Sequence, residues 1–233
     1  MSSPSEIQSH AQRVESRTRS KAPLGLRIGF WACIAISVAV VLRRIAALAF
    51  PRPSAAPQLE KLDASFASDA ALTLAHIIPA LAFVILVPIV LLRPPGKASW
   101  AERILFLLGI VVGLTAYAMS IFAVGGWIER YAVLCFNTWF LFSLARAFVY
   151  RQRAELAIER RWLLRAVVVL LGIATTRPVM GVFFATSPLT HLTPSQFFGI
   201  AFWIGFSINA AVVEIWLHSG ARWLRQIAAL PAR

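Results

Sequence analysis

Six long apolar stretches, separated by short connections, constrain this chain more than any motif does. They run over residues 26–48, 70–92, 104–124, 131–150, 162–185 and 197–218. A helix needs about 20 residues to cross a hydrocarbon core of ~30 Å, and each stretch meets that length. None of them alternates polar and apolar residues as a strand of a membrane barrel would. The sequence therefore predicts an all-α fold: a polytopic membrane protein built as a six-transmembrane-helix bundle.

The amino-acid composition agrees with a lipid environment. Of the 233 residues, 59% are hydrophobic and only 14% are charged, whereas a soluble domain carries about 25% charged residues. Polar groups inside a membrane must be satisfied within the protein, because lipid offers them no partner. Each polar residue within a span therefore needs a structural or functional reason.

The basic residues predict the orientation of the chain. The net charge is +13, and the positive residues gather on alternate connections. One side carries Arg13, Arg17, Arg19, Lys21, Arg27, Arg93, Lys97, Arg103, Arg146, Arg151, Arg153, Arg160, Arg161, Arg165, Arg222, Arg225 and Arg233. The other carries Arg43, Arg44, Arg52, Lys61 and Arg130. Basic loops stay in the cytoplasm, so both termini are predicted to be cytoplasmic. The charge then indicates membrane lipids as partners and no nucleic acid.

The chain divides into three predicted regions. Residues 1–24 are rich in Ser and Arg, and we expect a disordered cytoplasmic tail. Residues 25–218 form the transmembrane domain. Residues 219–233 are weakly amphipathic, which is typical either of a short cytoplasmic helix on the membrane surface or of a frayed helix end. Residues 151–161 are expected to continue the fourth helix beyond the membrane, with Arg151 and Glu155 at the i,i+4 spacing of a helical ion pair.

Two interpretations remain for the pair Arg43-Arg44, which lies where basic residues are disfavoured. In the first, the first span ends near Leu42 and the arginines extend to the outer interface. In the second, residues 28–42 are the core of a signal peptide and Ala47-Leu48-Ala49 is its cleavage site. The long segment before the span favours the first interpretation.

Four polar residues lie within spans at similar predicted depths in the outer half of the bundle: His76, Asn137, Thr176 and Arg177. Arginine costs ~2.5–3.5 kcal/mol in the centre of a membrane helix, so Arg177 should face the bundle or a water-filled cavity. Pro178 follows it and frees a carbonyl one turn earlier. One interpretation is a polar pocket in which Arg177 binds an anion or carbonyl and His76 donates a proton or acts as a ligand. The other is structural, with Arg177 capping freed carbonyls and His76 making one interhelical bond.

A second polar group is predicted near the inner boundary. Glu214 lies deep in the sixth span, and an ion pair with Arg165 or Arg146 would neutralise its carboxylate. We expect this ion pair to be structural rather than part of a proton relay. Asn209 is expected to be an interhelical hydrogen-bond partner.

The sequence contains no recognisable catalytic or metal-binding motif. It has no glycine-rich phosphate loop, no nucleophile elbow and no HExxH. Cys33 and Cys135 lie in different halves of the membrane and are not expected to form a disulfide. His76 is the one histidine well inside a span, whereas haem held by two histidines needs a partner on a facing helix. We therefore expect no metal site, no cofactor and no haem, and a non-enzymatic role is favoured.

Several segments carry a resemblance to a known family. They are Ala75-His76-Ile77, the third-span run from Gly113 to Ser120, Asn137-Thr138-Trp139, Ala145-Arg146, the run from Glu159 to Arg165, Thr176-Arg177, and Trp203 followed by Asn209 and Glu214. In order and spacing this resembles the bacterial membrane proteins of domain-of-unknown-function family 2306, over residues 70–218. The resemblance implies a multi-pass protein of the bacterial inner (plasma) membrane and implies no activity. Two family histidines correspond here to Glu159 and the neighbourhood of Ala101-Glu102, which weakens any haem or metal role.

Three classes of function are compatible with these features. The first is binding or transport of a small molecule through an outward-facing polar pocket, which requires a cavity between the second, fourth and fifth spans. The second is a haem-b-type electron-transfer protein that has lost ligands. The third is a membrane interaction or assembly subunit, in which the buried polar residues would be fully paired. The sequence favours the first.

Overall fold

The computed structural model describes residues 24–50, 64, 67–93 and 99–228, with only the helical backbone given over 220–228. The predicted tail 1–24 lies outside the described residues except for Leu24, and so do residues 229–233 of the predicted C-terminal tail. Two compact units are present, residues 1–32 and 33–233. In the first unit, residues 24–32 form the start of helix α2, where the rings of Phe30 and Trp31 meet edge to face at 5.6 Å.

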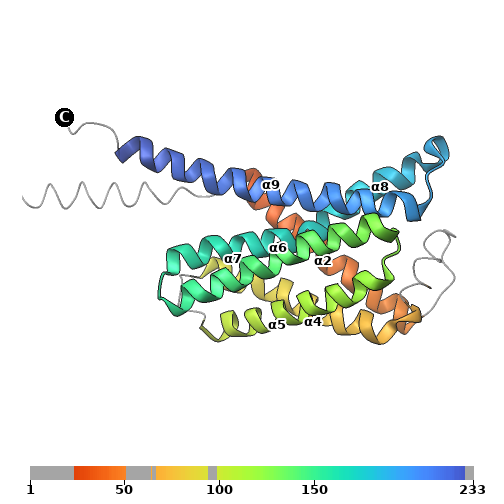
Figure 1. Cartoon of the computed structure of the whole chain (residues 1–233), viewed down its shortest axis with the longest axis horizontal. Coiled ribbons are helices and arrows are strands. Elements are labelled where there is room, and N and C mark those ends of the chain that lie inside the picture. The colour runs from red at the N-terminus through yellow and green to blue at the C-terminus, as the bar shows by residue number, and fades with distance from the viewer. Residues whose placement is uncertain (1–23, 51–63, 65–66, 94–98, 229–233) are drawn as a thin grey trace, which may run out of the picture. The chain divides into compact units, whose positions relative to one another are not determined.

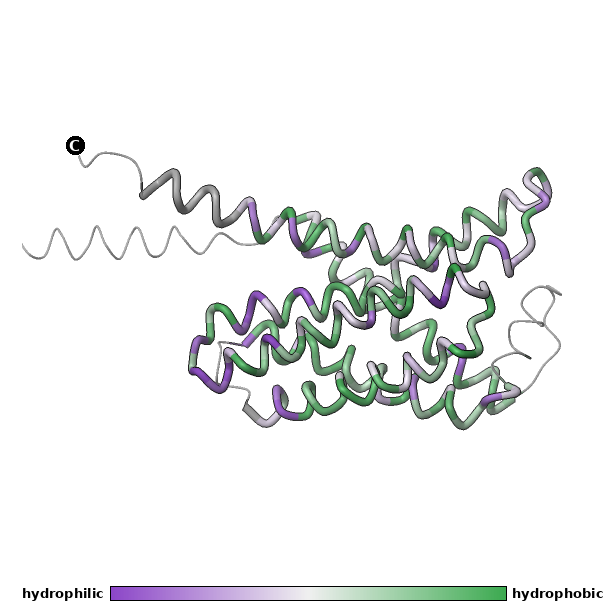
Figure 2. The backbone as a smooth tube through the Cα atoms, in the orientation of Figure 1, coloured by the Kyte–Doolittle hydropathy of each residue, from purple (hydrophilic) through white to green (hydrophobic). Residues whose placement is uncertain are grey.

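Helices account for nearly all the described part of the second unit (Figure 1). Its elements are the rest of α2 (Leu24–Ala49), α4 (Ala70–Leu92), α5 (Ser99–Met119), the short 3-10 helix η1 (Ser120–Phe122), α6 (Gly126–Gln152), α7 (Leu156–Leu170), α8 (Gly172–Thr190) and α9 (Pro194–Ala228). Within the described ranges, six helical segments are long and apolar enough to cross a membrane. The prediction of an all-α, six-helix membrane bundle is therefore confirmed. Figure 2 shows the hydrophilic residues gathered mainly toward the helix ends.

Helix α6 lies at the centre of the second unit, where it packs against α5, α7 and α9. Helices α4 and α5 form one further pair, and α8 and α9 another. The core between them is apolar and close-packed: Phe83 of α4 meets Phe140 of α6 edge to face at 5.9 Å, and both rings are buried. Glycines allow α5 to approach α6, because a Cβ at Gly113 would lie 2.4 Å from the Leu141 side chain.

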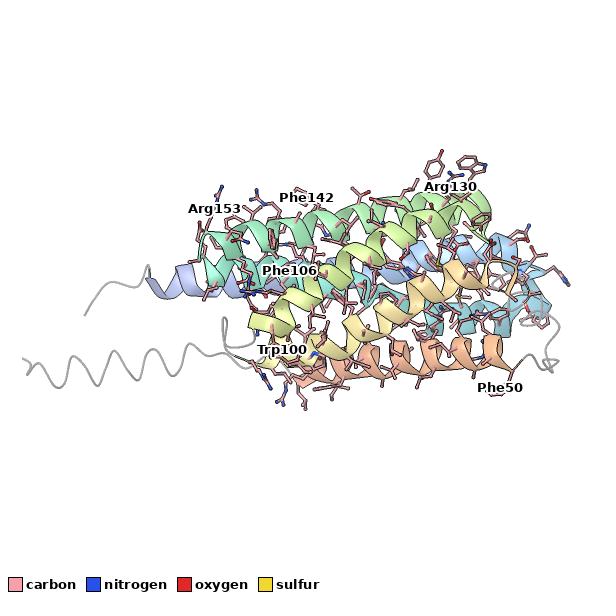
Figure 3. All side chains as sticks on the ribbon, turned by 90° about the horizontal axis from the view of Figure 1, so that it is seen from below. Phe50, Trp100, Phe106, Arg130, Phe142 and Arg153 are labelled. Atoms are coloured by element: carbon pink, nitrogen blue, oxygen red, sulfur yellow. The ribbon has the colours of Figure 1, made fainter. Side chains whose placement is uncertain are left out.

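The two ends of this bundle differ in which helices begin there. One end of the bundle, which we call distal, contains the C-termini of α2, α5 and α8 and the N-termini of α4, α6 and α9. At the opposite, proximal end, α4 and α6 end while α5 and α7 begin. Arg130 and Arg153 mark the distal and proximal ends of α6 in Figure 3. The positive-inside pattern predicts that the proximal end faces the cytoplasm.

The predicted continuation of the fourth helix over 151–161 is wrong. Helix α6 ends at Gln152, and the chain reverses through a turn in which Ala154 has a φ of 58° before α7 begins. Arg151 bonds to Glu102 of α5 and lies 3.2 Å from Glu159 of α7 instead of pairing with Glu155. The two carboxylates are buried, so the tertiary ion pairs outweigh a solvent-exposed helical pair.

The sixth helix passes through the predicted boundary at residue 218. Helix α9 runs without interruption from Pro194 to Ala228, so the first part of the predicted tail continues the transmembrane helix. A surface-lying tail over 219–233 stays a prediction.

The fifth span is interrupted, but not at its proline. Helices α7 and α8 meet at Leu171, seven residues before Pro178. A Cβ at Gly172 would lie 2.6 Å from the ring of Phe206, so the glycine lets α8 approach α9 at the interruption. Asn209 of α9 donates from Nδ2 to the Val168 carbonyl at 2.9 Å and accepts from the Thr175 hydroxyl at 2.7 Å. The prediction that Asn209 is an interhelical hydrogen-bond partner is confirmed.

Candidate functional site

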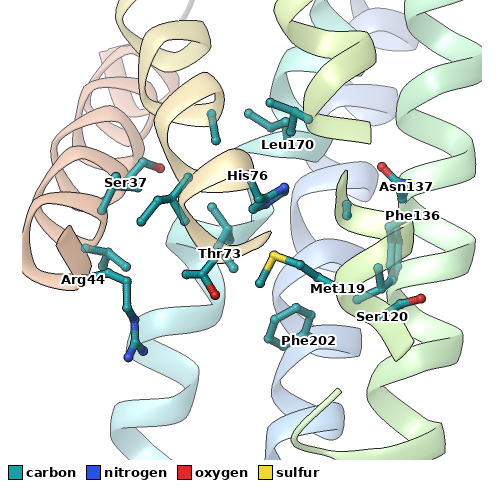
Figure 4. Close-up of a pocket in the computed structure, with 18 of the residues that line it drawn as sticks. Ser37, Arg44, Thr73, His76, Met119, Ser120, Phe136, Asn137, Leu170 and Phe202 are labelled. Atoms are coloured by element: carbon teal, nitrogen blue, oxygen red, sulfur yellow. The ribbon is translucent and has the colours of Figure 1, made fainter. Parts of the chain in front are cut away.

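A cavity of about 260 Å³ lies in the second unit, in the distal half of the bundle. Side chains from α2, α4, α5, α6, α7, α8 and α9 line it, together with η1 and the residues around it. Along α4 the lining runs from Asp69 to Val84, and along α6 from Glu129 to Phe140. The cavity therefore extends from the distal helix ends toward the middle of the spans. Figure 4 shows its wall from α2 and α4 on one side and from α6 and α9 on the other.

Charged side chains gather at the distal part of the lining, which we call the mouth. They are Arg44 of α2, Asp69 before α4, Glu129 of α6 and Arg177 of α8. Arg44 belongs to the pair Arg43-Arg44, for which the sequence allowed two interpretations: the outer end of the first span, or a site near a signal-peptide cleavage point. Helix α2 does not end near Leu42 but continues to Ala49, which carries Arg44 into the cavity wall (Figure 4).

Arg177 has few hydrogen bonds for a buried guanidinium. Its Nη1 lies 3.9 Å from the sulfur of Met180, which is a weak acceptor. Its Nε is buried and has no hydrogen-bond partner among the described residues. The interpretation in which Arg177 caps freed carbonyls of its own helix is therefore not the arrangement found. A guanidinium has five donors and stays charged, so unused donors at a cavity wall favour an acceptor inside the cavity.

Glu129 is a mouth residue that sequence reasoning missed. The predicted fourth span began at residue 131, whereas α6 begins at Gly126 and makes Glu129 part of the helix. The carboxylate is buried, with an exposed fraction of 8%, and its Oε2 accepts the backbone N–H of Gly125 at 2.6 Å. The negative side chain thus stabilises the start of α6, where unpaired N–H groups and the helix dipole favour an anion. Its charge also attracts Arg177.

His76 lies deeper than the mouth and is fixed to α5. Its Nδ1 is 2.9 Å from the hydroxyl of Thr115. That hydroxyl also lies 2.7 Å from the Val111 carbonyl, one turn earlier in α5, and its one proton is used there. The network therefore assigns the proton of the imidazole to Nδ1, which donates to Thr115.

Asn137 lies at a similar level on α6 and also contacts α5. Its Nδ2 donates to the carbonyl of Gly113 at 2.9 Å, and the side chain is buried. His76 and Asn137 thus fix the helices on either side of α5 at neighbouring turns. We call this level the waist of the cavity (Figure 4). Its hydrogen bonds are interhelical, which is the common role of polar side chains inside a membrane bundle.

Beyond the waist, farther from the distal end, the lining is apolar. This floor is made by Ala80, Leu81, Val84, Val112, Phe140, Val169 and Leu170. The cavity therefore has three levels: a charged mouth, a polar waist and an apolar floor.

The structure brings three of the four residues of the predicted polar pocket to this cavity. His76, Asn137 and Arg177 line it, whereas Thr176 does not. Thr176 is fully buried at the crossing of α8 with α9, and its hydroxyl donates to the Gly172 carbonyl at 2.9 Å. Successive residues of a helix point about 100° apart, and here Thr176 is turned toward Gly205 of α9 while Arg177 lines the cavity. The placement of Thr176 in the pocket is corrected accordingly.

The structure also shows which of the two arginines, Arg165 or Arg146, forms the predicted inner ion pair with Glu214. Arg165 binds Glu214 through two hydrogen bonds, of 2.5 and 3.0 Å. Arg146 is not within ion-pair distance of Glu214; it donates to the hydroxyl of Tyr150 at 2.7 Å, and its guanidinium lies 5.3 Å from the ring of Trp162. This cluster lies toward the proximal end, away from the cavity lining.

Among the described residues, no group of three or more His, Cys, Asp or Glu side chains is arranged to hold a metal ion. Cys33 and Cys135 are both free thiols. Among the described residues that line the cavity, His76 is the one histidine.

Comparison with known proteins adds no relative. No family model, no curated protein and no solved structure matches this chain.

Proposed function

We propose that this membrane protein binds a small molecule in the cavity between its helices and either carries it across the bilayer or presents it there. The observation that supports this proposal most directly is Arg177, whose Nε is buried at the cavity wall without a partner in the described chain. An unmade hydrogen bond of a buried polar group costs ~1–3 kcal/mol, and a ligand acceptor beside this guanidinium would offset that cost.

The shape of the cavity supports the same proposal. A mostly apolar hollow with a few polar groups at one end is the usual form of a small-molecule site. Its volume of about 260 Å³ lies just below the ~300–1,000 Å³ typical of such sites, which favours a small or slender ligand.

We further propose that the chain is a multi-pass protein of the bacterial inner membrane with cytoplasmic termini, related to family 2306. Six spans and the alternate distribution of basic residues support the orientation. In this orientation the mouth of the cavity faces outward. Retention of α2 follows from the proposal, because Ser37 and Arg44 of that helix belong to the cavity lining.

The two other classes of function are less well supported. A haem protein with two axial histidines needs a second histidine at the level of His76, and the described lining offers none. An assembly subunit would have its polar residues fully paired, whereas Arg177 in this structure is not.

The proposal is tested by extracting the molecules that copurify with the full chain and identifying them by mass spectrometry. A visible spectrum of the same sample reports haem directly. We expect one compound class at close to one molecule per chain, depleted in Ala80→Leu, which fills the cavity floor. Arg130→Gln removes a charge at the distal end outside the lining and should leave the bound compound unchanged. Equal recovery from wild type and Ala80→Leu would overturn the proposal.

A further inference from the structure

The lining of the cavity changes from charged to apolar along its length, and this gradient restricts what fits inside. A uniformly polar solute would place its polar groups against the apolar floor without hydrogen-bond partners. A pure hydrocarbon would bury the charges of the mouth without partners. A molecule with a polar head and one apolar chain satisfies both ends.

The charges around Arg177 indicate the sign of the head. The charged groups that act on it most strongly are Arg44 and Arg43, followed by Glu129. Arg177 is thus a cation beside two other cations and one anion, and Asp69 adds a second anion to the mouth. A guanidinium in a poorly hydrated site is costly, and an anion bound beside Arg177 would offset that cost.

The hydrogen bonds at the mouth also favour an anionic head. Glu129 already accepts from the Gly125 N–H, and it is not within ion-pair distance of Arg177 in the described structure. Arg177 lines the cavity, and among the described residues no carboxylate lies within ion-pair distance of its guanidinium. Carboxylate and phosphate oxygens are the acceptors for which a guanidinium fork is best suited.

The floor sets the size of the apolar part. Its side chains come from four helices, and none of them is polar. The volume of the whole cavity is small, so one chain fits the hollow better than the two tails of a phospholipid.

We infer that the ligand is a single-chain amphiphile with an anionic head, its carboxylate or phosphate held at the mouth by Arg177 and its chain extending past His76 and Asn137 into the floor. The inference rests on the proposed function and names its ligand class. The two waist side chains take no direct part in holding the head, because their hydrogen bonds go to α5.

The test uses the full chain in nanodiscs of phosphatidylcholine and five probes: dodecanoate, octanoate, dodecyl phosphate, methyl dodecanoate and decyl-benzoquinone. Binding is measured at equilibrium and by the rise in Tm. We expect dodecanoate, dodecyl phosphate or both to bind at least tenfold more tightly than the neutral ester, since a charge-assisted hydrogen bond contributes ~1.5–3 kcal/mol. Preference for dodecanoate identifies a free fatty acid as the source, and preference for dodecyl phosphate a phosphorylated lipid.

Variants assign the binding to this cavity. Arg177→Gln should weaken the preferred anion about tenfold or more and leave the ester unchanged, while Arg130→Gln changes neither. Ala80→Leu should weaken dodecanoate more than octanoate, because only the longer chain reaches the floor. If Arg177→Gln does not fold, Arg44→Gln at the same mouth is expected to act in the same direction.

Each other outcome contradicts a defined part of the argument. If the ester or the quinone binds as tightly as the anions, or the anions bind normally to both Arg177→Gln and Arg44→Gln, the anionic class is wrong while small-molecule binding stands. If no probe binds and nothing copurifies with the wild type, the proposed function itself fails.

Discussion

Arg165 of α7 holds Glu214 of α9 through two hydrogen bonds, Nε to Oε1 at 2.5 Å and Nη2 to Oε2 at 3.0 Å. The Arg165 side chain is 12% exposed and that of Glu214 is 32% exposed. The guanidinium also lies 4.6 Å from the ring of Trp162, which is close enough for a cation–π contact. The pair thus links two helices while keeping a carboxylate paired near the end of a membrane span.

We expect Arg165→Gln to destabilise the protein by about 1–3 kcal/mol, because it leaves a partly buried carboxylate without its cation. Glu214→Gln should cost a similar amount, and the double variant less than the sum, since the two changes remove one interaction. Thermal unfolding in one detergent measures all three. Arg161→Gln is the control, because its only hydrogen bond among the described residues, to the Leu217 carbonyl, is long at 3.4 Å. Strictly additive effects would show that the pair contributes nothing specific.

Arg151 should be the most sensitive arginine of the proximal end. It forms a hydrogen bond to Glu102 and lies 3.2 Å from Glu159. Glu102 is only 2% exposed and Glu159 only 3%. Arg151→Ala leaves two buried carboxylates facing each other without a cation, for which we expect a loss of ~3–5 kcal/mol or failure to accumulate in the membrane. Arg153→Ala, two residues later and exposed, should change stability by no more than ~0.5 kcal/mol. Comparable losses for the two variants would contradict the role of Arg151.

The positions of the spans could be predicted because length and apolarity are local properties of the sequence. Depth in the membrane is nearly local too, since it follows from counting residues along a helix. Counting predicted one level for His76, Asn137 and Arg177. The structure has all three along one cavity, with Arg177 at the mouth and the other two deeper, at the waist.

Features that depend on helix rotation and packing could not be predicted. Thr176 was placed with Arg177 because the two lie at a similar predicted depth, but the helix turns Thr176 toward Gly205 of α9. The partner of Arg151 lies 49 residues away on α5 and no spacing rule indicates it. Glu129 was missed because the apolar pattern starts after it, while α6 begins three residues before it at Gly126.

The topology of the chain is predicted to place both termini in the cytoplasm, because six spans return the chain to its starting side and the basic connections lie on that side. Reporter fusions active only in the cytoplasm should work at both termini, and a periplasm-specific reporter should work in the loop at His191–Thr193. Signals from opposite sides at the two termini would contradict the orientation. If only the C-terminal reporter showed a cytoplasmic location, removal of the first helix would be favoured.

Two glycines, Gly205 of α9 and Gly181 of α8, offer a matched test of the α8–α9 crossing. A Cβ at Gly205 would lie 2.5 Å from Oγ1 of Thr176 and 2.7 Å from its backbone nitrogen, so the helix backbones could not keep their distance. We expect Gly205→Ala to destabilise the protein by about 1–3 kcal/mol, as overpacking a core usually does. A Cβ at Gly181 of α8 meets no atom within 4 Å. Gly181→Ala should therefore be neutral or slightly stabilising, because Ala favours the helix by about 1 kcal/mol over Gly. Unfolding of both variants in the same detergent measures the difference, and an equal Tm for the two would show that α8 and α9 do not cross as closely at Gly205 as the structure has them.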